Sequence, residues 1–258
     1  MLGEKRVDIV RKLQTEVLRL QCLKPAGHTT IDMGWGEISR ALPDGGFPLG
    51  AIHEFLSAGA HDITASCGFI AGLLSPLMGK SGTCLWISSA RTLFPPALKS
   101  FGIQPDRVIF ICLQKENDVL WAMNEALKCS ALSAVVGEMQ EISFKASRKL
   151  QLAVESSRVT GFVLRHNPRK VNPTACVSRW KITTLPSDPI STDEGDELPG
   201  VGFPQWRVEL MRIRNGKPGI WDIKWRNGRF FPSIGSSEFR ADVNSPENAS
   251  FYLKKKTG

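Results

Sequence analysis

The alternation of short apolar runs with helix-like segments between residues 51 and 166 is the feature that most constrains how this chain can fold. Strands buried on both faces read as unbroken apolar runs, and the helices between them return the chain so that successive strands lie parallel. The strand-like runs are 51–56, 83–88, 107–113, 132–137 and 160–166, and the helix-like segments are 63–77, 94–101, 117–130 and 142–157. The pattern predicts an α/β domain with a mostly parallel central sheet flanked by helices.

After residue 170 the pattern changes to one typical of antiparallel strands. Polar and apolar residues alternate there, as in strands with one buried face, and the segments concerned are 175–185, 205–214 and 219–226. Asn215-Gly216 and Asn227-Gly228 are dipeptides that favour hairpin turns. We therefore expect the sheet to finish in antiparallel hairpin strands, with residues 187–202 as an acidic surface loop rich in proline and glycine.

Both ends of the chain are expected to lie outside the core domain, which we place at residues 28–235. Residues 1–27 are predicted to form an amphipathic helix that ends at Pro25 and Gly27. Its apolar stripe shares one helical face and includes Val10, Leu13, Val17 and Leu20. The stripe either binds a protein partner or packs against the chain's own core, and the sequence leaves both open. Residues 236–258 are predicted to be a flexible basic tail.

Composition argues against several classes of protein. No run of about 18 apolar residues is present, so no membrane span is expected, and the N-terminal segment is too charged for a secretory signal. We therefore expect a cytoplasmic protein. The six cysteines form no CxxC pair, so we expect them to be buried apolar residues and not metal ligands. The net charge of +8 permits binding to nucleic acid or to an acidic partner.

The chain lacks the residues of a nucleotide-binding site. A phosphate-binding loop follows a strand, precedes a helix and ends in Gly-Lys-Ser/Thr. The one such triplet, Gly79-Lys80-Ser81, precedes the strand-like run 83–88, so it is not a phosphate loop. The turn after 51–56 is in the right place, but it carries one glycine, Gly59, and a carboxylate, Asp62, where a cation is needed. The Asp62 carboxylate is expected to cap the following helix and to repel a triphosphate.

Several strings resemble segments of RecA and occur in the same order as in RecA. They are IHEFLSAGAHDITA, TCLWISSARTLFPPALKSFGIQPDRVIF, AVVGEM and RKLQLAVESSRVTGFVLRH, and the resemblance covers roughly residues 50–231. It implies a RecA-like core in which the phosphate-loop, catalytic-glutamate and Walker B positions are occupied by His61, Asp62, Ile63, Ala90 and Gly137. Glu138 adjoins Gly137, so a shifted carboxylate stays open. Neither a cofactor, a metal ion nor ATP hydrolysis is expected, because the cation, the metal ligands and the general base are all replaced.

A more specific resemblance is to the ImuA family of RecA-like accessory proteins. It is carried by LWISSARTLFPPALKSFGI, DVLWAMNEALKCSALSAVVGEM, SRKLQLAVESS and PQWRVELMRIRNGKPG. The resemblance implies a non-catalytic role in SOS-induced, error-prone translesion DNA synthesis. The implied partners are an ImuB-type Y-family polymerase homologue, an error-prone replicative-type DNA polymerase subunit and RecA. Two alternatives stay open: a cell-division inhibitor of the SulA type, whose chain is shorter, and a divergent ATPase acting in recombination.

Direct contact with DNA is a further expectation. By the RecA resemblance, the second DNA-binding loop corresponds to the short segment around HNPRKVNP, where Arg165, Arg169 and Lys170 are the candidate contacts. Cations also alternate with tryptophans in QWRVELMRIR and GIWDIKWR. Such strands either hold nucleic acid by stacking and phosphate contact or bury their tryptophans and leave the cations in solvent. The alternation with period two favours the second arrangement.

Overall fold

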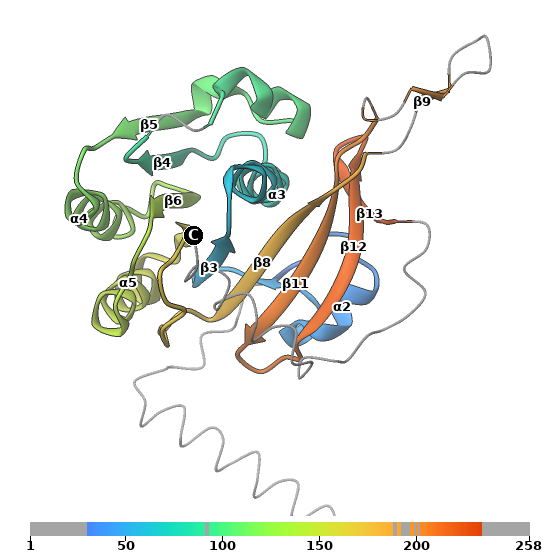
Figure 1. The fold of residues 1–258 in the computed structure, drawn as a ribbon. Helices are drawn as coiled ribbons and strands as arrows, with labels where there is room; N and C mark the ends of the chain where they lie inside the picture. The colour runs from blue at the N-terminus through green and yellow to red at the C-terminus, as the bar shows by residue number, and fades with distance from the viewer. Residues whose placement is uncertain are drawn as a thin grey trace, which may run out of the picture.

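A nine-stranded sheet organises the computed structural model, which describes residues 30–233 except 91–92, 188–189, 192–196, 199 and 201. The strand order is β13-β12-β11-β8-β3-β7-β6-β4-β5 (Figure 1). The strands are β3 (Ile52–Ser57), β4 (Cys84–Ser88), β5 (Val108–Cys112), β6 (Ala134–Met139), β7 (Thr160–His166), β8 (Ser178–Leu185), β11 (Gln205–Ile213), β12 (Gly219–Arg226) and β13 (Arg229–Pro232). The pairs from β5 to β8 are all parallel, whereas β11, β12 and β13 pair antiparallel. The predicted mixed α/β class, with a mostly parallel sheet and closing hairpin strands, is confirmed.

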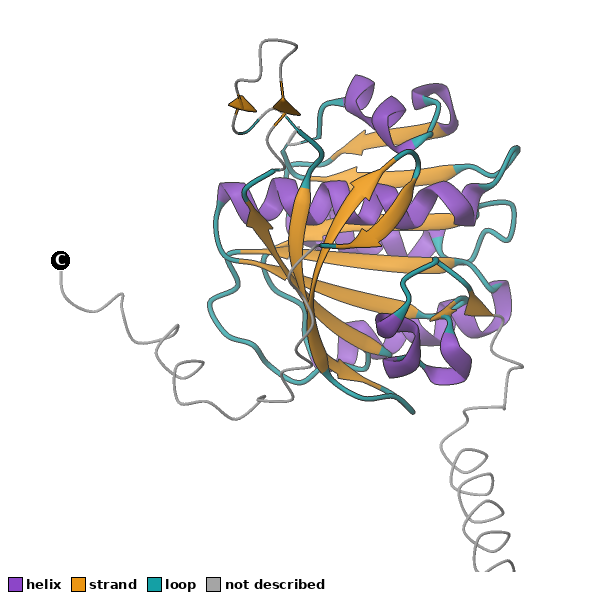
Figure 2. Cartoon of the chain, turned by 90° about the vertical axis from the view of Figure 1, so that its right-hand side faces the viewer, coloured by secondary structure: helices purple, strands orange, loops and turns teal. Residues whose placement is uncertain are grey.

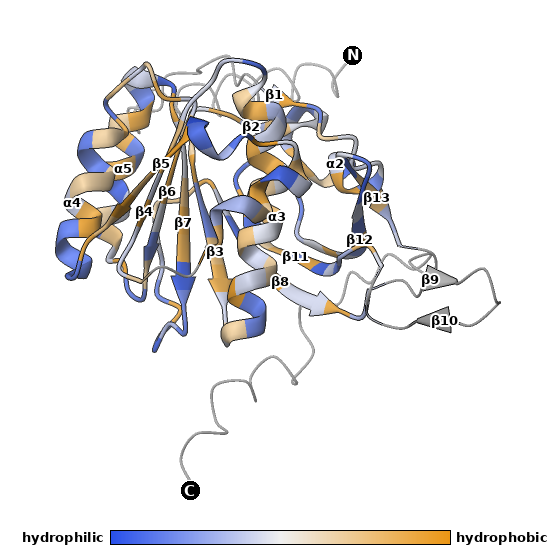
Figure 3. Ribbon diagram, turned by 90° about the horizontal axis from the view of Figure 1, so that it is seen from above, coloured by the Kyte–Doolittle hydropathy of each residue, from blue (hydrophilic) through white to orange (hydrophobic). Residues whose placement is uncertain are grey.

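Helices cover both faces of the parallel part of the sheet. Helix α3 (Ala60–Met78) lies on one face, and α4 (Glu116–Ala126) and α5 (Phe144–Ser157) lie on the other (Figure 3). The α3 side chains pack with one buried cluster, whereas those of α4 and α5 pack with a second cluster. The strands between these layers are apolar because both of their faces are buried. No helix among the described residues is long and apolar enough to cross a lipid bilayer.

The segment before β3 adds short elements that the sequence did not predict. They are β1 (Thr30–Ile31), α2 (Glu37–Ala41), the 3₁₀ turn η1 (Pro43–Gly45) and β2 (Phe47–Pro48). Trp35 and Ile38 join the α3-side cluster, and the Trp35 ring lies 5.5 Å from Phe230 of β13. This segment therefore closes the core beneath the hairpin strands. The predicted N-terminal helix and basic tail lie outside the described residues.

The two expected hairpin turns differ in length. Asn227 and Gly228 both have positive φ, 51° and 74°, and they alone join β12 to β13, as in a two-residue hairpin of the favoured hand. Asn215, with φ of 58°, lies instead in the longer loop 214–218 between β11 and β12. Figure 2 shows how the hairpin strands curl away from the plane of the parallel strands.

The tryptophans of the hairpin strands belong to the core. Trp206, Trp221 and Trp225 are buried on the face that packs against α3 and α2, whereas Arg207 and Arg226 on the opposite face are exposed. The arrangement that leaves only the cations in solvent is therefore the observed one. Stacking of nucleic-acid bases on these rings would require the core to open.

Candidate functional site

The turn between β3 and α3 is the position to which the RecA resemblance assigns the phosphate-binding loop. Only Ala58 and Gly59 separate the end of β3 at Ser57 from the start of α3 at Ala60. A phosphate-binding motif of about eight residues needs a wider loop, whose backbone N–H groups surround the ligand. In this chain the Ser57 hydroxyl instead lies 2.8 Å from the Ser66 hydroxyl and donates to the backbone oxygen of Asp62 at 3.3 Å. The end of the strand is thus tied directly onto the helix.

The sequence-predicted residues of this turn lie within the first turn of α3. His61 is exposed, and Asp62 and Ile63 are half-buried. The expectation that the Asp62 carboxylate caps the helix is not met, because the N-cap residue is Gly59 and no side-chain cap hydrogen bond is made there. The helix begins at Ala60, so Asp62 already lies inside it. Its negative charge still favours the helix dipole and disfavours a phosphate.

The Walker B strand of the resemblance corresponds to β6, and its alternation decides which side chain faces α3. A Cβ atom at Gly137 would lie 2.5 Å from the Met123 sulfur of α4, so this position faces the α4 layer and any larger residue would have to displace the Met123 side chain. Glu138 points to the opposite face, is 2 % exposed, and accepts a hydrogen bond of 2.5 Å from the Trp86 indole. On β6 the carboxylate on the α3 face is therefore the shifted one, Glu138, and it is held by Trp86.

The remaining predicted nucleotide positions carry no ligand chemistry. Ala90 is exposed just after β4. His166, which the RecA resemblance aligns with a nucleotide-sensing glutamine, is half-buried at the end of β7. Within the described residues, no group of three His, Cys, Asp or Glu side chains could hold a metal ion. Among the described residues, Cys67, Cys84 and Cys176 are buried as predicted, whereas Cys112 and Cys129 are exposed, contrary to the prediction. Cys22 lies outside the described residues.

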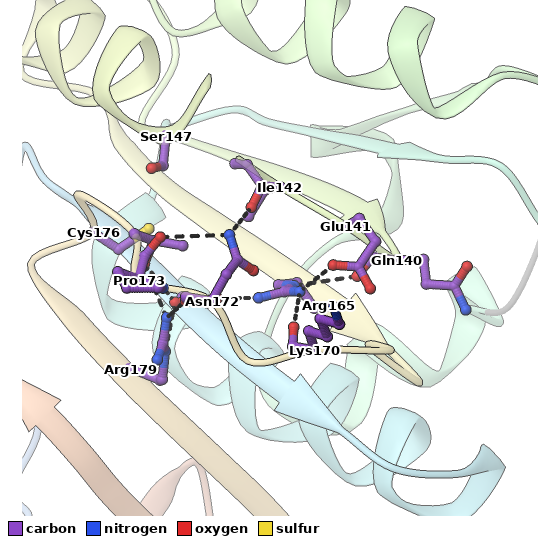
Figure 4. A network of polar contacts seen from close by, with 12 residues as sticks. Gln140, Glu141, Ile142, Ser147, Arg165, Lys170, Asn172, Pro173, Cys176 and Arg179 are labelled. Carbon is purple, nitrogen blue, oxygen red and sulfur yellow. Dashed lines mark hydrogen bonds and ion pairs between the residues drawn. The ribbon is translucent and has the colours of Figure 1, made fainter. Parts of the chain in front are cut away.

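A buried ionic network lies on the α5 side of the sheet, and Figure 4 shows the part of it around Arg165 and Arg179. Its centre is Glu54 of β3, whose side chain is fully buried. The Glu54 carboxylate accepts hydrogen bonds from Arg165 Nη1 at 2.8 Å, Arg179 Nε at 2.8 Å and the Thr174 hydroxyl at 2.7 Å. Three donors on one carboxylate compensate the cost of burying its charge. The network links β3, β7 and β8 across the middle of the sheet.

Arg165 uses its whole guanidinium within the network. Besides Glu54, it donates from Nη2 to the Glu141 carboxylate at 2.7 Å and to the backbone oxygen of Lys170 at 2.9 Å, and from Nε to the backbone oxygen of Gln140 at 3.2 Å. The second carboxylate oxygen of Glu141 accepts from the Arg169 backbone N–H at 2.7 Å. Arg165 and Glu141 therefore hold the loop after β7 through its backbone at Arg169 and Lys170.

A second polar residue of β3, His53, is buried on the α3 side. Its Nε2 lies 2.8 Å from the backbone oxygen of Pro48, and its Nδ1 lies 2.7 Å from the Ser178 hydroxyl. The Trp180 indole donates to the same hydroxyl at 2.6 Å, so the hydroxyl proton is free to point at Nδ1. Burial lowers the pKa of His53 to about 3, although the hydrogen bond to Pro48 opposes the shift. The imidazole is neutral in the folded protein.

Comparison with known proteins identifies the family of this chain. It is 35% identical over 206 residues to Protein ImuA of Caulobacter vibrioides, and the match spans 75% of this chain and 82% of that protein. The chain belongs to the ImuA family. Cell division inhibitor SulA of Yersinia pseudotuberculosis is 26% identical over 162 residues, which is 62% of this ImuA-family chain and 95% of that protein. SulA of Serratia marcescens is 28% identical over 109 residues. No family model matches the chain.

The expected DNA contacts of this ImuA-family protein separate into two kinds. Arg165 is fully buried and its nitrogen atoms are engaged by protein oxygens, so it has no group available for a phosphate. Arg169 and Lys170 are exposed at the tip of the loop that Arg165 fixes. The network thus holds the loop that carries Arg169 and Lys170 by hydrogen bonds to its backbone. Of the three expected DNA contacts, only Arg169 and Lys170 are exposed to a ligand.

The residues of the ImuA-family network escaped the sequence interpretation, although they left a signal. Glu54 and Arg165 each place a charge in a mostly apolar strand-like run, whereas Arg179 lies in a strand where polar and apolar residues alternate. A charge at a buried strand position needs an opposite charge nearby. Glu54 and Arg165 were therefore each a reason to look for an opposite charge on a neighbouring strand. The strand order that makes them neighbours is not visible in the sequence.

Proposed function

We propose that this chain is a non-catalytic RecA-like accessory protein in SOS-induced, error-prone translesion DNA synthesis. Membership of the ImuA family supports a role in the error-prone repair cassette. The observation that carries the non-catalytic part is the β3–α3 turn, where two residues and the nearby Asp62 carboxylate stand in place of a phosphate loop and its lysine. Without that cation, the charge that develops on a transferred phosphoryl group has no stabilising partner there.

The RecA-like part of the proposal is supported by topology. Along the sheet, β5, β4, β6 and β7 lie on one side of β3, while β8 and the antiparallel strands lie on the other. The helical connections and the closing hairpin strands follow the order of elements that the RecA resemblance implies. Buried Glu138 and Glu54 take structural partners in this fold, namely Trp86 and two arginines.

The proposed partners are an ImuB-type polymerase homologue, an error-prone replicative-type polymerase subunit and RecA. We place one partner surface on Val10, Leu13, Val17 and Leu20, which lie outside the described residues. Replacing Leu13 and Val17 with Asp is expected to abolish co-purification of the ImuB-type partner while the circular dichroism spectrum and the thermal midpoint stay unchanged. Unfolding of the double variant would mean that the stripe packs on the chain's own core.

Complementation of a gene deletion tests the proposed function in the cell. We expect deletion to lower the frequency of damage-induced mutations, and the wild-type chain and Asp62→Asn to restore it equally, because no hydrolysis step uses this turn. The purified full chain should release no phosphate from radiolabelled ATP above the buffer background. Turnover above background that is lost in a variant of the turn would overturn the non-catalytic role.

A cell-division inhibitor of the SulA type is the second candidate, supported by the match that spans 95% of one SulA chain. Overexpression separates the two functions. An inhibitor of division makes cells filament whether or not the polymerase partners are present, whereas the accessory role predicts normal division and a changed mutation frequency only when the partners are encoded.

A further inference from the structure

Helices α4 and α5 lie side by side on one face of the sheet (Figures 1 and 3). Their side chains line a groove between the two helices. The groove has a volume of about 420 Å³, and its apolar lining comes from Leu120 of α4 and from Ala146 and Leu150 of α5. Trp121 also lines the groove, yet its side chain is 67 % exposed. A tryptophan this exposed beside an apolar groove is typical of a surface that binds another protein.

Helix α5 carries two further exposed apolar side chains outside the groove lining. Phe144 is 57 % exposed and Leu152 is 47 % exposed. The outward face of a helix that meets only solvent is usually polar. Here the two helices of one layer carry three large apolar residues on their outward faces. The opposite layer differs, because α3 is covered on its far side by the hairpin strands and α2.

The charge of the groove is positive. Lys145 and Lys149 both line it, both are exposed, and they stand one helical turn apart on α5. Among the described residues, neither ammonium group has a carboxylate partner, and no carboxylate lines the groove. Asn117 adds an amide at the rim. The groove therefore combines an apolar part, an exposed aromatic ring and two ammonium groups that lack counter-charges, and the amides of Asn117 and Asn124 and the hydroxyl of Ser143 complete its lining.

We propose that the α4–α5 groove is a docking site for an acidic peptide segment of a partner protein. An aromatic or branched apolar side chain of the segment enters between Leu120, Trp121 and Leu150, and carboxylates nearby in the segment bind Lys145 and Lys149. Apolar anchors supply most of the affinity of such contacts, and the charge pairs supply orientation and selectivity. The proposal does not depend on the function proposed above, since the groove chemistry defines the segment whichever protein supplies it.

A nucleic acid fits the groove less well than a peptide does. The charged residues of α4 are all acidic, namely Glu116, Asp118 and Glu125. A polyanion that extended past the two lysines would meet these carboxylates, whereas a short acidic segment with an apolar anchor ends before it reaches them. A track of cations along the backbone, which single-stranded nucleic acid requires, is absent from the described part of this groove.

Peptide selection tests the proposal on the full-length chain. A phage-displayed library of random 16-residue peptides is selected on the wild-type chain and counter-selected on the double variant Trp121→Ala/Lys149→Glu. Phe94→Ala/Lys99→Glu is the matched control, because Phe94 is 68 % exposed, Lys99 is exposed, and both lie outside the groove. This control also removes a lysine charge, so it reports any non-specific attraction of acidic peptides to the basic chain.

We expect the selected peptides to carry Asp or Glu within a few residues of an aromatic or branched apolar residue. By fluorescence anisotropy they should bind the wild type and the control equally and the groove variant at least tenfold more weakly, with unchanged thermal midpoints. Exchange of their carboxylates for lysine should restore binding to Lys145→Glu/Lys149→Glu. The proposal fails if no peptide binds the wild type, if the selected peptides lack carboxylates, or if the groove variant binds them as the control does. It also fails if a fluorescent single-stranded dT20 probe, and not the peptides, loses affinity in the groove variant.

Discussion

Removal of the Glu54 carboxylate is expected to destabilise the whole sheet. Glu54 and Arg165 are both fully buried, and Glu54 accepts from Arg165, Arg179 and Thr174. In Glu54→Leu the only carboxylate left to the Arg165 guanidinium is that of Glu141, whose side chain is 40% exposed. Breaking a buried ion pair by removing one partner costs about 3–5 kcal/mol. We therefore expect the free energy of unfolding in urea, measured by far-ultraviolet circular dichroism, to fall by that amount.

A double-mutant cycle identifies the origin of the loss. We expect Arg165→Met to lower the free energy of unfolding as much as Glu54→Leu does. The loss in the double variant Glu54→Leu/Arg165→Met should be smaller, by at least about 2 kcal/mol, than the sum of the two single losses, because an apolar pair leaves no buried charge unpaired. Arg207→Met is the control, since the Arg207–Asp222 pair lies at the surface and is worth about 1 kcal/mol or less. A loss below about 1 kcal/mol in Glu54→Leu, or strict additivity in the cycle, would refute the argument that the network holds the sheet.

Three further perturbations follow from the same structure. Glu54→Leu should speed tryptic cleavage after Arg169 and Lys170, because Arg165, which holds this loop, loses its buried carboxylate partner. An unchanged cleavage rate would count against the argument that the Glu54 network holds the loop in place. Between pH 6.5 and 5 the wild type should lose about 2 kcal/mol of stability through His53, because the folded pKa is lowered to about 3 and only the unfolded chain takes up the proton. That part of the pH dependence should vanish in His53→Gln but persist in a variant of the exposed His61. Glu138→Leu should lower the free energy of unfolding by about 1–3 kcal/mol, because it leaves the buried indole N–H of Trp86 unpaired. Glu138→Gln should lower it less, because the amide oxygen can still accept that hydrogen bond. Equal urea midpoints for the two variants would refute the role of Glu138 as the acceptor for Trp86.

Local patterns in the sequence were enough to predict the elements of the sheet. The strands from β3 to β8, together with β11 and β12, fall where apolar runs and period-two alternation placed them, whereas β13 follows the predicted Asn227-Gly228 turn without a predicted range of its own. Helix α3 begins at Ala60 and not at residue 63, because the residues that resemble a turn form its first helical turn. Residues 94–101 were expected to be helical and contain the 3₁₀ helix η2 (Pro95–Phe101), where two prolines occupy the start. The short elements before β3 are too brief to leave a periodic pattern.

The candidate sites required information that the sequence does not hold. The alternation of β6 shows that Gly137 and Glu138 face opposite ways, but only the positions of α3 and α4 decide which of them faces the helix after β3. The Glu54 network depends on the order β7-β3-β8, which is set by contacts more than 100 residues apart. The α4–α5 groove likewise depends on how two separate helices pack, and its lysines resemble ordinary solvent-facing charges in the sequence.

Nucleotide binding by the full chain tests the central claim most directly. A ligand present at 100 times its Kd stabilises a folded protein by about 2.7 kcal/mol, which would raise the melting temperature of a chain of this size by roughly 5–10 °C. With 1 mM MgATP we expect no shift in the wild type or in Lys80→Ala, because the β3–α3 turn offers Asp62 and no ammonium group to the phosphates. A saturable rise in melting temperature with MgATP, abolished by a substitution in residues 57–63, would contradict the account.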